Sequence, residues 1–404
     1  MVKNIIIVND YSFVNGGAGN VAISSAKGLA ELGYNVILFT AVGDDGIKNR
    51  LKVISLKQGD LLSGKNKITS MIQGIYNIKA EKEFNKLLSE YEPDDTIIHL
   101  HGWYKALSPV IWKSIRNKGF KFVVTLHDYF LICPNGGLYN YPHGKICKEK
   151  PSSIKCLVSS CDSRSYPIKI WRDVRQLYQL LQMHKVSKDK FNVIYISKLN
   201  KDVTYPFLKK YTNKWYYLSN PVELKKELIV DVKKNSKYLF MGRLSSEKGL
   251  DLFCHAISEL GLEGVVVGDG YMKAKFEGEY KNIEFTGWLT GEKKLEVINK
   301  CKCLVFPSRW YEGAPLTIIE LQSLGMPCIV PDRCAASEEV IDNQTGFVFR
   351  SGDVNSLKAV LQKAENCNLS IIQQNILDTF HAEKYELRNH CMNLLQIYDE
   401  ILKN

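Results

Sequence analysis

Two glutamates, Glu312 and Glu320, lie eight positions apart in the stretch RWYEGAPLTIIELQSLGMPCIV (309–330). Two carboxylates this close could act as an acid/base pair, clamp a metal ion, or bind a ligand rich in hydroxyl groups. Pro315 lies between them and favours the first turn of a helix, because the N–H that proline lacks would have no intrahelical partner there. Glu312 then falls in the loop outside the helix and Glu320 about one and a half turns inside it, so both can border one ligand.

The start of this helix is also a candidate anion site. We expect the backbone N–H groups of Leu316, Thr317 and Ile318 to be unpaired at the positive end of the helix dipole. Such N–H groups are a common phosphate-binding arrangement in proteins.

A cationic loop, GRLSSEKG (242–249), follows the predicted strand KYLFM. Arg243 offers a fork of donors and Lys248 a point charge, which together suit a diphosphate. Parallel-sheet folds bind anions in loops at the carboxyl ends of their strands. Either cation alone is more often a surface salt-bridge partner, so the interpretation depends on their coincidence with the helix start and the two glutamates.

The first half of the chain carries two further candidates. Gly16 and Gly17, in VNGGAGN (14–20), let the backbone approach a phosphate closely, although the spacing is not that of a dinucleotide fingerprint. A tight turn without a ligand is the alternative. His127 ends the predicted strand KFVVTL, a position from which a side chain can touch substrate.

Buried apolar runs separated by helical or polar stretches indicate the strands of parallel sheets. In the first half these runs are NIIIVN (4–9), NVILFT (35–40), TIIHLH (96–101), KFVVTLH (121–127) and NVIYIS (192–197). In the second half they are KYLFMG (237–242), GVVVG (264–268), IEFTG (283–287), CLVFPS (303–308), PCIVPD (327–332) and TGFVF (345–349). The pattern predicts two doubly wound α/β domains in tandem, joined near YLSNPVE (217–223).

Charge is divided unevenly along the 404 residues. Residues 1–222 carry 32 Lys and Arg against 17 Asp and Glu, whereas the remainder carries 22 against 26. We therefore expect the first half either to contact something anionic or to present a solvated lysine-rich face.

The sequence also bears on location. No apolar run approaches the roughly 18 residues that would span a bilayer, and the first run is too short for a signal peptide. The eleven cysteines, spread through predicted strands and helices, suit a reducing compartment. We expect a soluble, cytoplasmic protein.

Taken in order, the motifs resemble those of the retaining glycosyltransferases of family 4, which have the GT-B architecture of two Rossmann-like domains facing across a cleft. The resemblance covers nearly the whole chain, and Glu312 and Glu320 fit the family's E-x7-E pattern. The other matching pieces are the Gly-Gly loop, TLHDYFLICP (125–134), SNPV (219–222), GRLSSEKG and VFPSRWYEGAPLTIIELQSLGMPCIV (305–330).

The resemblance implies a division into domains. Residues 1–220 would form an acceptor-side domain with a cysteine-containing insertion at about 130–165, and residues 221–385 a nucleotide-sugar-binding domain. A C-terminal helix over 386–404 would pack back toward the N-terminal domain.

The resemblance also implies roles on the donor. Glu320 would bind the ribose hydroxyls and Glu312 the hydroxyls of the donor sugar. Arg243 and Lys248 would neutralise the diphosphate, helped by the N–H groups of Leu316 and Thr317 and by the glycines of the first loop, Gly16 and Gly17. His127 would lie beside donor sugar and acceptor, and Trp288 would contact the base unless it is a core tryptophan.

Physical chemistry agrees with these roles, since fixed cations and helix N–H groups stabilise charge that develops on a departing phosphate. A retaining glycosidase would need facing carboxylates at about 5–5.5 Å and would leave the phosphate-binding groups unused. A metal clamp is disfavoured because the chain has no Asp-x-Asp pair and the two cations supply its charge. Retention in the family is thought to need no protein nucleophile, because the leaving phosphate helps to deprotonate the acceptor.

Four cysteines, Cys133, Cys147, Cys156 and Cys161, cluster in the insertion at spacings of 14, 9 and 5. These spacings contain no Cys-x2-Cys pair, so a structural zinc site is a weakly indicated alternative to ordinary reduced cysteines. The insertion is expected to shape the acceptor side.

The stretch YPIKIWRDVRQLYQLLQMHK (166–185) predicts an amphipathic helix with an apolar face and a basic one. The apolar face holds Ile170, Trp171, Val174, Leu177, Tyr178 and Leu181, and the polar face Lys169, Arg172, Arg175 and Gln176. The helix could pack its apolar face on the core or dock on an anionic membrane.

We therefore expect a metal-independent retaining hexosyltransferase that needs no cofactor beyond its nucleotide-sugar donor, with a UDP-sugar favoured over a GDP-sugar. Its acceptor would be a growing surface glycan (O-antigen, capsule or exopolysaccharide) on a polyprenyl-diphosphate lipid, met at the inner face of the cytoplasmic membrane. The alternatives are a soluble sugar synthase, which absence of the basic helix face from the surface would favour, a catalytically dead relative, and a cationic nucleic-acid-binding protein. The last leaves both glutamates unexplained, and no nucleic-acid-binding module is visible.

Overall fold

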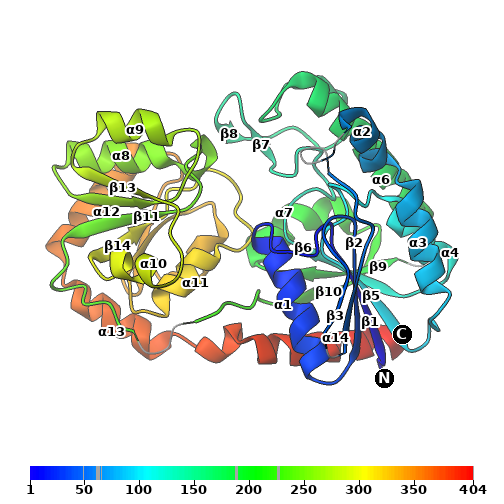
Figure 1. The fold of residues 1–404 in the computed structure, drawn as a ribbon. Coiled ribbons are helices and arrows are strands. Elements are labelled where there is room, and N and C mark those ends of the chain that lie inside the picture. Colours follow the sequence, from blue (N-terminus) through cyan, green and yellow to red (C-terminus); the bar gives the residue numbers. More distant parts are fainter. Residues whose placement is uncertain (49, 61–63, 65, 187–189, 225–227, 404) are drawn as a thin grey trace. The chain divides into compact units, whose positions relative to one another are not determined.

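The structure is a computed structural model that describes residues 1–48, 50–60, 64, 66–186, 190–224 and 228–403 (Figure 1). The chain divides into two compact units. The N-terminal unit comprises residues 1–137, 148–221 and 383–404, and the C-terminal unit comprises 138–147 and 222–382.

In the described residues, the sheet of the N-terminal unit has the strand order β10-β9-β6-β5-β1-β2-β4-β3. All neighbours are parallel except β3 and β4. The strands are β1 (Asn4–Val8), β2 (Asn35–Thr40), β3 (Gly46–Lys48), β4 (Leu51–Ser55), β5 (Thr96–Leu100), β6 (Phe122–Leu126), β9 (Phe191–Tyr195) and β10 (Thr212–Tyr217). The central strand β1 is buried from Ile5 to Val8, as expected for a sheet covered on both faces.

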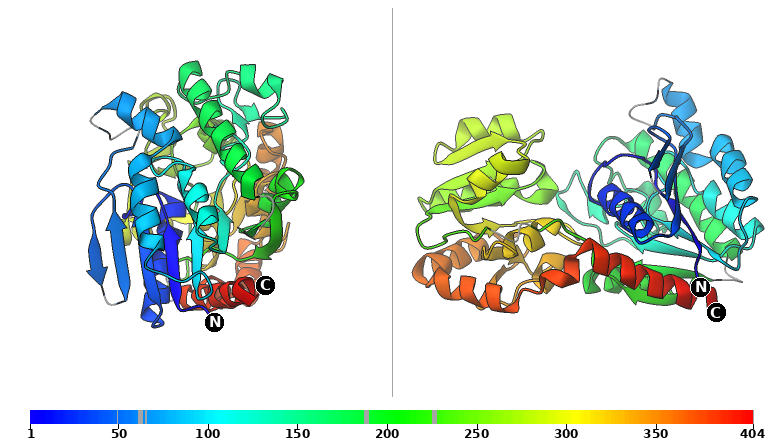
Figure 2. Two further views of the ribbon diagram at one scale, coloured as in Figure 1. Left: turned by 90° about the vertical axis from the view of Figure 1, so that its right-hand side faces the viewer. Right: turned by 60° about the horizontal axis from the view of Figure 1, so that its bottom comes forward.

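Helices form a layer on each side of this sheet. Figure 1 shows α1 (Gly17–Glu31) on one side and α3 (Ile78–Leu88) and α4 (Val110–Asn117) on the other. The C-terminal helix α14 (Leu387–Lys403) shares a core cluster with α1 and the sheet. The two chain ends lie side by side in Figures 1 and 2, and the Val2 N–H donates to an Asp399 carboxylate oxygen at 2.7 Å.

The described sheet of the C-terminal unit is fully parallel, with the order β13-β12-β11-β14-β15-β16. Its strands are β11 (Lys237–Met241), β12 (Gly264–Val267), β13 (Ile283–Gly287), β14 (Cys301–Val305), β15 (Cys328–Pro331) and β16 (Gly346–Phe349). Its helices are α8 (Leu250–Glu259), α9 (Lys273–Glu279), α10 (Gly291–Ile298), α11 (Leu316–Gln322), α12 (Val354–Asn366) and α13 (Leu369–Thr379). Each unit is a doubly wound α/β structure, as the sequence predicts.

The predicted strands all form, whereas the sequence analysis missed the three-residue edge strand β3 and also β4 and β10. Strands β4 and β10 carry polar residues at exposed or half-buried positions, which breaks the apolar run that identifies a central strand. The insertion forms a hairpin of β7 (Tyr139–Asn140) and β8 (Lys145–Ile146) and a short helix, α5 (Ile154–Val158). Residues 138–147 of the insertion cluster with the C-terminal unit.

The amphipathic helix forms as α6 (Tyr166–Val186), but neither of its faces lies where either prediction put it. Lys169, Arg175 and Gln176 of the polar face are buried, while Ile170 and Leu181 of the apolar face are exposed. The expectation of an apolar face on the core is wrong for all but the buried Trp171 and the half-buried Tyr178, and that of a basic face at the surface is wrong for Lys169 and Arg175. None of the helices in the described ranges combines the length and apolar content that a bilayer crossing requires.

The packing of α14 on α1 yields a test of the fold. A β-carbon on Gly28 of α1 would lie 2.7 Å from the Cys391 sulfur and 3.2 Å from Leu387. We expect Gly28→Ala to lower the free energy of unfolding by about 1–3 kcal/mol through overpacking. Gly278→Ala in α9, where a β-carbon meets no atom within 4 Å, is the matched control and should be stabilising by up to about 1 kcal/mol. Equal urea midpoints for the two variants would contradict this packing.

Candidate functional site

Most of the predicted donor-site residues lie at the topological switch point of the C-terminal sheet. Strand β11 pairs with β12 on one side and with β14 on the other, so the chain leaves these strands in opposite directions. In open α/β sheets this divergence opens a crevice at the carboxyl ends of the strands, where ligands bind. Arg243 and Lys248 follow β11, and Glu312 follows β14. The fold therefore brings to one crevice edge residues that are far apart in sequence.

Lys248 and Glu312 form an ion pair across the two loops. The Ser308 hydroxyl lies 3.3 Å from the same Glu312 carboxylate oxygen, and the Lys248 ammonium lies 5.3 Å from the centre of the Trp310 ring. Both charged side chains are largely buried, with 20% and 12% of their surface exposed. The pair is thus a preformed charged element, in which each partner neutralises the other until a ligand arrives.

Glu247 joins the two loops, a role that the sequence analysis missed. Its carboxylate, 5% exposed, accepts hydrogen bonds from Arg243 at 2.9 Å and from the Ser245 hydroxyl at 2.7 Å. Its backbone carbonyl accepts from the Arg309 N–H at 2.8 Å. Gly249 permits this close approach, since it adopts φ +74° and a β-carbon there would collide with the Pro307 carbonyl.

Helix α11 begins as predicted between the two glutamates. Pro315 occupies the position before the first helical residue, with φ −79° and ψ 93°. The expectation of three unpaired N–H groups is wrong for Ile318, which donates to the Pro315 carbonyl at 3.0 Å. The N–H groups of Leu316 and Thr317 lie in the first turn, where a helix offers no intrahelical acceptor.

Glu320 and Trp288 have different surroundings. Glu320, on α11, pairs with Lys294 of α10, and both side chains are about a quarter exposed. Trp288 follows β13, two strands from β11 in the sheet order, and is 68% exposed. The alternative of a core tryptophan is therefore wrong, and the ring can stack on a ligand.

The N-terminal unit has its own switch point, at β1 between β5 and β2. Gly16 caps α1 directly after this point with φ +90°, a conformation that favours glycine. A β-carbon on Gly16 or Gly17 would meet no atom within 4 Å. The space beside this backbone is open, as close approach of a ligand requires.

His127 follows β6, is itself half-buried, and contacts a chain of buried histidines. Its Nε2 lies 2.8 Å from His101 Nδ1, and His101 Nε2 lies 3.2 Å from His99 Nδ1. His99 in turn contacts the Tyr398 hydroxyl at 2.6 Å and the Thr125 hydroxyl at 2.7 Å. The sequence signal for this chain was present in TIIHLH, because residues two apart share one face of a strand.

Burial keeps these rings uncharged. It lowers the pKa of His127 to about 3 and holds the pKa values of His99 and His101 well below the usual 6.5, with neighbouring histidines adding to the effect. A neutral imidazole has one donor and one acceptor nitrogen. Contact with His101 therefore couples the two rings, since one of the facing nitrogens must donate and the other accept, and the His127 ring can serve as a hydrogen-bonding group beside a substrate.

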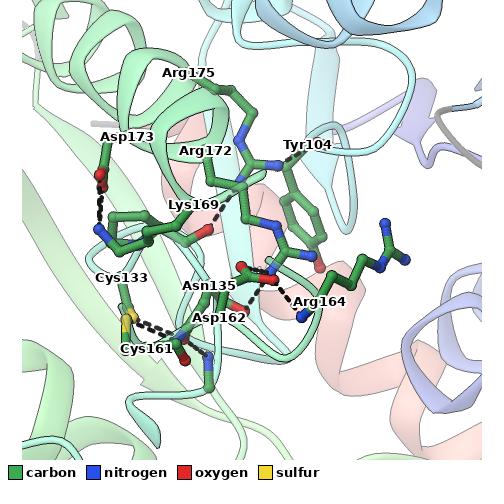
Figure 3. A network of polar contacts seen from close by, with 12 residues as sticks. Tyr104, Cys133, Asn135, Cys161, Asp162, Arg164, Lys169, Arg172, Asp173 and Arg175 are labelled. Atoms are coloured by element: carbon green, nitrogen blue, oxygen red, sulfur yellow. Dashed lines mark hydrogen bonds and ion pairs between the residues drawn. The ribbon is translucent and has the colours of Figure 1, made fainter. Parts of the chain in front are cut away.

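The cysteines of the insertion do not gather into a metal site within the described residues, where no group of three or more His, Cys, Asp or Glu could hold an ion. Cys133 donates to the Asn135 carbonyl oxygen of the side chain at 3.1 Å, and the Asn135 amide lies 3.4 Å from the Cys161 sulfur (Figure 3). Cys156 is buried nearby under α6, and Cys147 belongs with the C-terminal unit. The structure thus places Cys133 and Cys161 around Asn135 in a hydrogen-bonded loop, with Cys156 on α5 and Cys147 elsewhere.

Two tandem doubly wound units, each with candidate ligand-binding groups at its switch point, define the GT-B class of fold. The profile described as "Glycosyltransferase Family 4" matches residues 15–153, and that described as "Glycosyl transferases group 1" matches residues 223–377. The chain belongs to glycosyltransferase family 4 and is a transferase of glycosyl groups. The alternative of a nucleic-acid-binding protein is thereby set aside.

Similar proteins span much of the chain at low identity. A 42.6 kDa protein in the cps region of Klebsiella pneumoniae is 26% identical over 78% of this chain and 82% of its own length. A second relative is the UDP-Gal:alpha-D-GlcNAc-diphosphoundecaprenol alpha-1,3-galactosyltransferase of Escherichia coli. It is 24% identical, and the matched part covers 55% of this chain and 64% of that relative.

Solved structures share the fold over the whole chain. The sucrose-phosphate synthase of Thermosynechococcus elongatus superposes with a TM-score of 0.72 at 17% identity, covering 99% of both chains. HepE of Anabaena in complex with UDP superposes with a TM-score of 0.66 at 13% identity, covering 99% of this chain and 100% of HepE.

The buried histidines predict a pH-dependent stability. An unfolded histidine titrates near 6.5, whereas burial lowers the pKa of His390 to about 4 and that of His127 to about 3. Between the folded and unfolded pKa values, the unfolded chain binds more protons than the folded chain. The stabilisation that the neutral histidines give to the folded state is therefore complete above pH 6.5 and is lost as the pH falls. His390 alone should cost about 2 kcal/mol at pH 5 relative to pH 7.5.

Urea midpoints at pH 7.5 and 5 measure this loss. His390→Gln should flatten the dependence, whereas His255→Gln, which removes an exposed histidine, serves as the control. A midpoint unchanged between the two pH values would contradict the buried, neutral state of the histidines.

Proposed function

We propose that this protein is a retaining, metal-independent glycosyltransferase that moves a hexosyl unit from a UDP-sugar to a surface glycan carried on a lipid diphosphate. The observation that carries the proposal is the Lys248–Glu312 pair beside Arg243 at the switch point of the C-terminal sheet. It offers cations for a diphosphate and a carboxylate for sugar hydroxyls at one place.

The proposed chemistry follows from these charges. As the bond from the sugar to the diphosphate breaks, negative charge grows on the departing phosphate. An acceptor hydroxyl oxygen bonds to the same sugar carbon, and its proton passes to the departing phosphate. Lys248 exchanges part of its contact with Glu312 for that phosphate, while Arg243, whose side chain is 60% exposed and oriented by Glu247, reaches it from the same loop. These two cations supply the neutralisation that a metal ion would otherwise give. The freed Glu312 carboxylate binds hydroxyls of the donor sugar.

The relatives support the choice of donor and acceptor. The Escherichia coli relative is named for a UDP-galactose donor and a diphosphoundecaprenol acceptor, and HepE was solved with UDP. The Klebsiella pneumoniae relative is placed in a cps region. A UDP-sugar donor and an acceptor on a polyprenyl diphosphate are the corresponding assignments for this chain, at the inner face of the cytoplasmic membrane.

A sugar synthase acting on a free or phosphorylated sugar is the second candidate. The burial of Lys169 and Arg175 removes the basic helix face from the surface, which is the outcome expected for a synthase. The fold shared with a sucrose-phosphate synthase is compatible with it. The lipid-linked acceptor is preferred because α6 exposes an apolar face instead.

Replacing Glu312 and Glu320 in turn tests how the site binds the donor. Glu320→Ala should weaken UDP binding by roughly tenfold or more, because it removes a charged hydrogen-bond acceptor from the ribose. Glu312→Ala should leave UDP affinity within about threefold and lower kcat by roughly 100-fold, because its contacts are to the transferred sugar. Calorimetric titration of UDP and turnover of UDP-sugars, both with a chelator present, measure the two effects.

Glu259→Ala is the matched control, since Glu259 also pairs with a lysine, Lys358, but lies on the surface of α8. It should change neither quantity. Equal effects of the two site variants on UDP affinity and kcat would refute the division of roles, and absence of binding by UDP and GDP alike would refute the proposed function.

A further inference from the structure

Helix α6 has reversed polarity relative to a normal surface helix. Four apolar side chains at spacings of 4, 3 and 4 are exposed: Ile170 by 47%, Val174 by 45%, Leu177 by 48% and Leu181 by 57%. The opposite, polar side is buried, and it comprises Lys169, Asp173, Arg175, Gln176, Gln179 and Gln182. The burial of the charged side chains needs a physical cause. The exposure of the aliphatic side chains calls for a binding partner that covers them.

Backbone carbonyls of irregular loops hold the polar side inward. Arg175 donates to the Tyr104 carbonyl at 2.7 Å (Figure 3). It also donates to the Pro134 carbonyl at 3.0 Å. Gln176 donates to the Leu131 carbonyl at 2.9 Å. Such loops leave buried acceptors that no strand or helix satisfies, and each would be costly without a donor.

Ion pairs neutralise two of the cations that this arrangement buries, Lys169 and Arg172. Lys169 and Asp173 pair at 2.6 Å, one turn apart on α6, with 0% and 8% of their side chains exposed. Arg172 pairs with Asp162 of the insertion at 2.9 Å. Rotating α6 to bury its apolar side would break these contacts and leave the loop carbonyls buried without hydrogen-bond donors. The outward apolar face is therefore a fixed feature of the unit.

Two helices that contact α6 also expose apolar side chains. Trp171 of α6 donates its indole N–H to the Met71 carbonyl of α2 (Lys67–Ile75) at 2.8 Å, and α2 exposes Ile68 by 70% and Ile72 by 61%. Lys169 donates to the Cys156 carbonyl of α5 at 3.1 Å, and α5 exposes Ile154 by 80% and Val158 by 66%. Monomeric soluble proteins rarely leave so much aliphatic surface without a partner.

The charges at the surface of the same stretch are mostly positive. Across residues 148–186, where burial is described for all but residue 186, the exposed basic residues are Lys148, Lys150, Lys155, Arg164 and Lys185. Glu149 is the exposed acid of that part, since Asp162 and Asp173 are buried in ion pairs. An apolar surface with cationic neighbours complements a bilayer that has anionic headgroups.

We propose that the outward face of α6, with the exposed side chains of α2 and α5, docks this protein on an anionic lipid bilayer. The aliphatic side chains enter the boundary between headgroups and acyl chains, and the lysines lie among the lipid phosphates. This inference rests on the proposed function, because an enzyme whose acceptor is carried on a lipid meets that acceptor at the bilayer surface. A second copy of the chain would bring one cationic surface against another, so the bilayer is the favoured occupant.

Vesicle flotation with the full-length protein tests the docking surface. We expect binding to vesicles of phosphatidylcholine with about 30% phosphatidylglycerol, weaker binding to phosphatidylcholine alone, and loss of binding between about 0.1 M and 0.5 M salt. Leu177→Gln/Leu181→Gln should lower the partition coefficient by roughly tenfold or more, because it removes two inserting side chains. Ile371→Gln/Met392→Gln, which changes exposed apolar residues on α13 and α14, is the matched control and should bind like the wild type.

Three outcomes would overturn the inference. One is unchanged vesicle binding by the Leu177→Gln/Leu181→Gln variant, and another is wild-type binding that ignores anionic lipid. The third is a wild-type dimer, detected by light scattering, that this variant dissociates, because a second copy would then cover the face. Stabilisation by UDP, measured on the same samples, separates this inference from the donor proposal, since either can fail while the other holds.

Discussion

The buried carboxylate of Glu247 is the constraint on which the candidate donor site depends. It orients Arg243 through a hydrogen bond, and its own backbone carbonyl holds the Arg309 N–H of the loop after β14. Arg309 in turn pairs with Asp251 at 2.6–2.8 Å at the start of α8. The loops after two adjacent strands are thereby fixed against each other, so that Lys248 and Glu312 meet in one ion pair. A preorganised arrangement of this kind costs no reorganisation when charge develops on a ligand.

The two units supply different kinds of group. The C-terminal unit offers charges, two cations and two carboxylates that are each paired in the structure. The N-terminal unit offers neutral groups, an open glycine backbone and a histidine kept uncharged by burial. Charges suit the diphosphate and hydroxyls of a nucleotide sugar, and neutral hydrogen-bonding groups suit a sugar acceptor. The same unit carries the outward apolar face of α6, so the proposed acceptor site and the proposed lipid-docking surface belong to one part of the chain.

The sequence was sufficient to predict the parallel sheets, because a fully buried strand consists of a continuous run of apolar residues, such as IIIV (5–8) or GVVV (264–267). It also predicted the start of α11 from Pro315, and the loop positions of Arg243, Lys248 and Glu312. It did not predict the role of Glu247 in joining the two loops, since a single carboxylate in a loop forms no recognisable sequence motif. Periodicity grouped most side chains of α6 correctly, except the buried Trp171. It did not show which face turns inward, because that depends on carbonyls at Tyr104, Leu131 and Pro134 that no local pattern shows.

The central claim is that one nucleotide sugar is held between Glu312 and Glu320 with its diphosphate at Arg243 and Lys248. A crystal structure of the protein soaked with UDP or a UDP-sugar is the most direct measurement. The account predicts ribose hydroxyls within hydrogen-bonding distance of Glu320, phosphate oxygens on Arg243 and Lys248, and no metal ion bridging them. UDP bound away from the switch point of the C-terminal sheet, or its ribose on Glu312 with Glu320 still paired to Lys294, would contradict it.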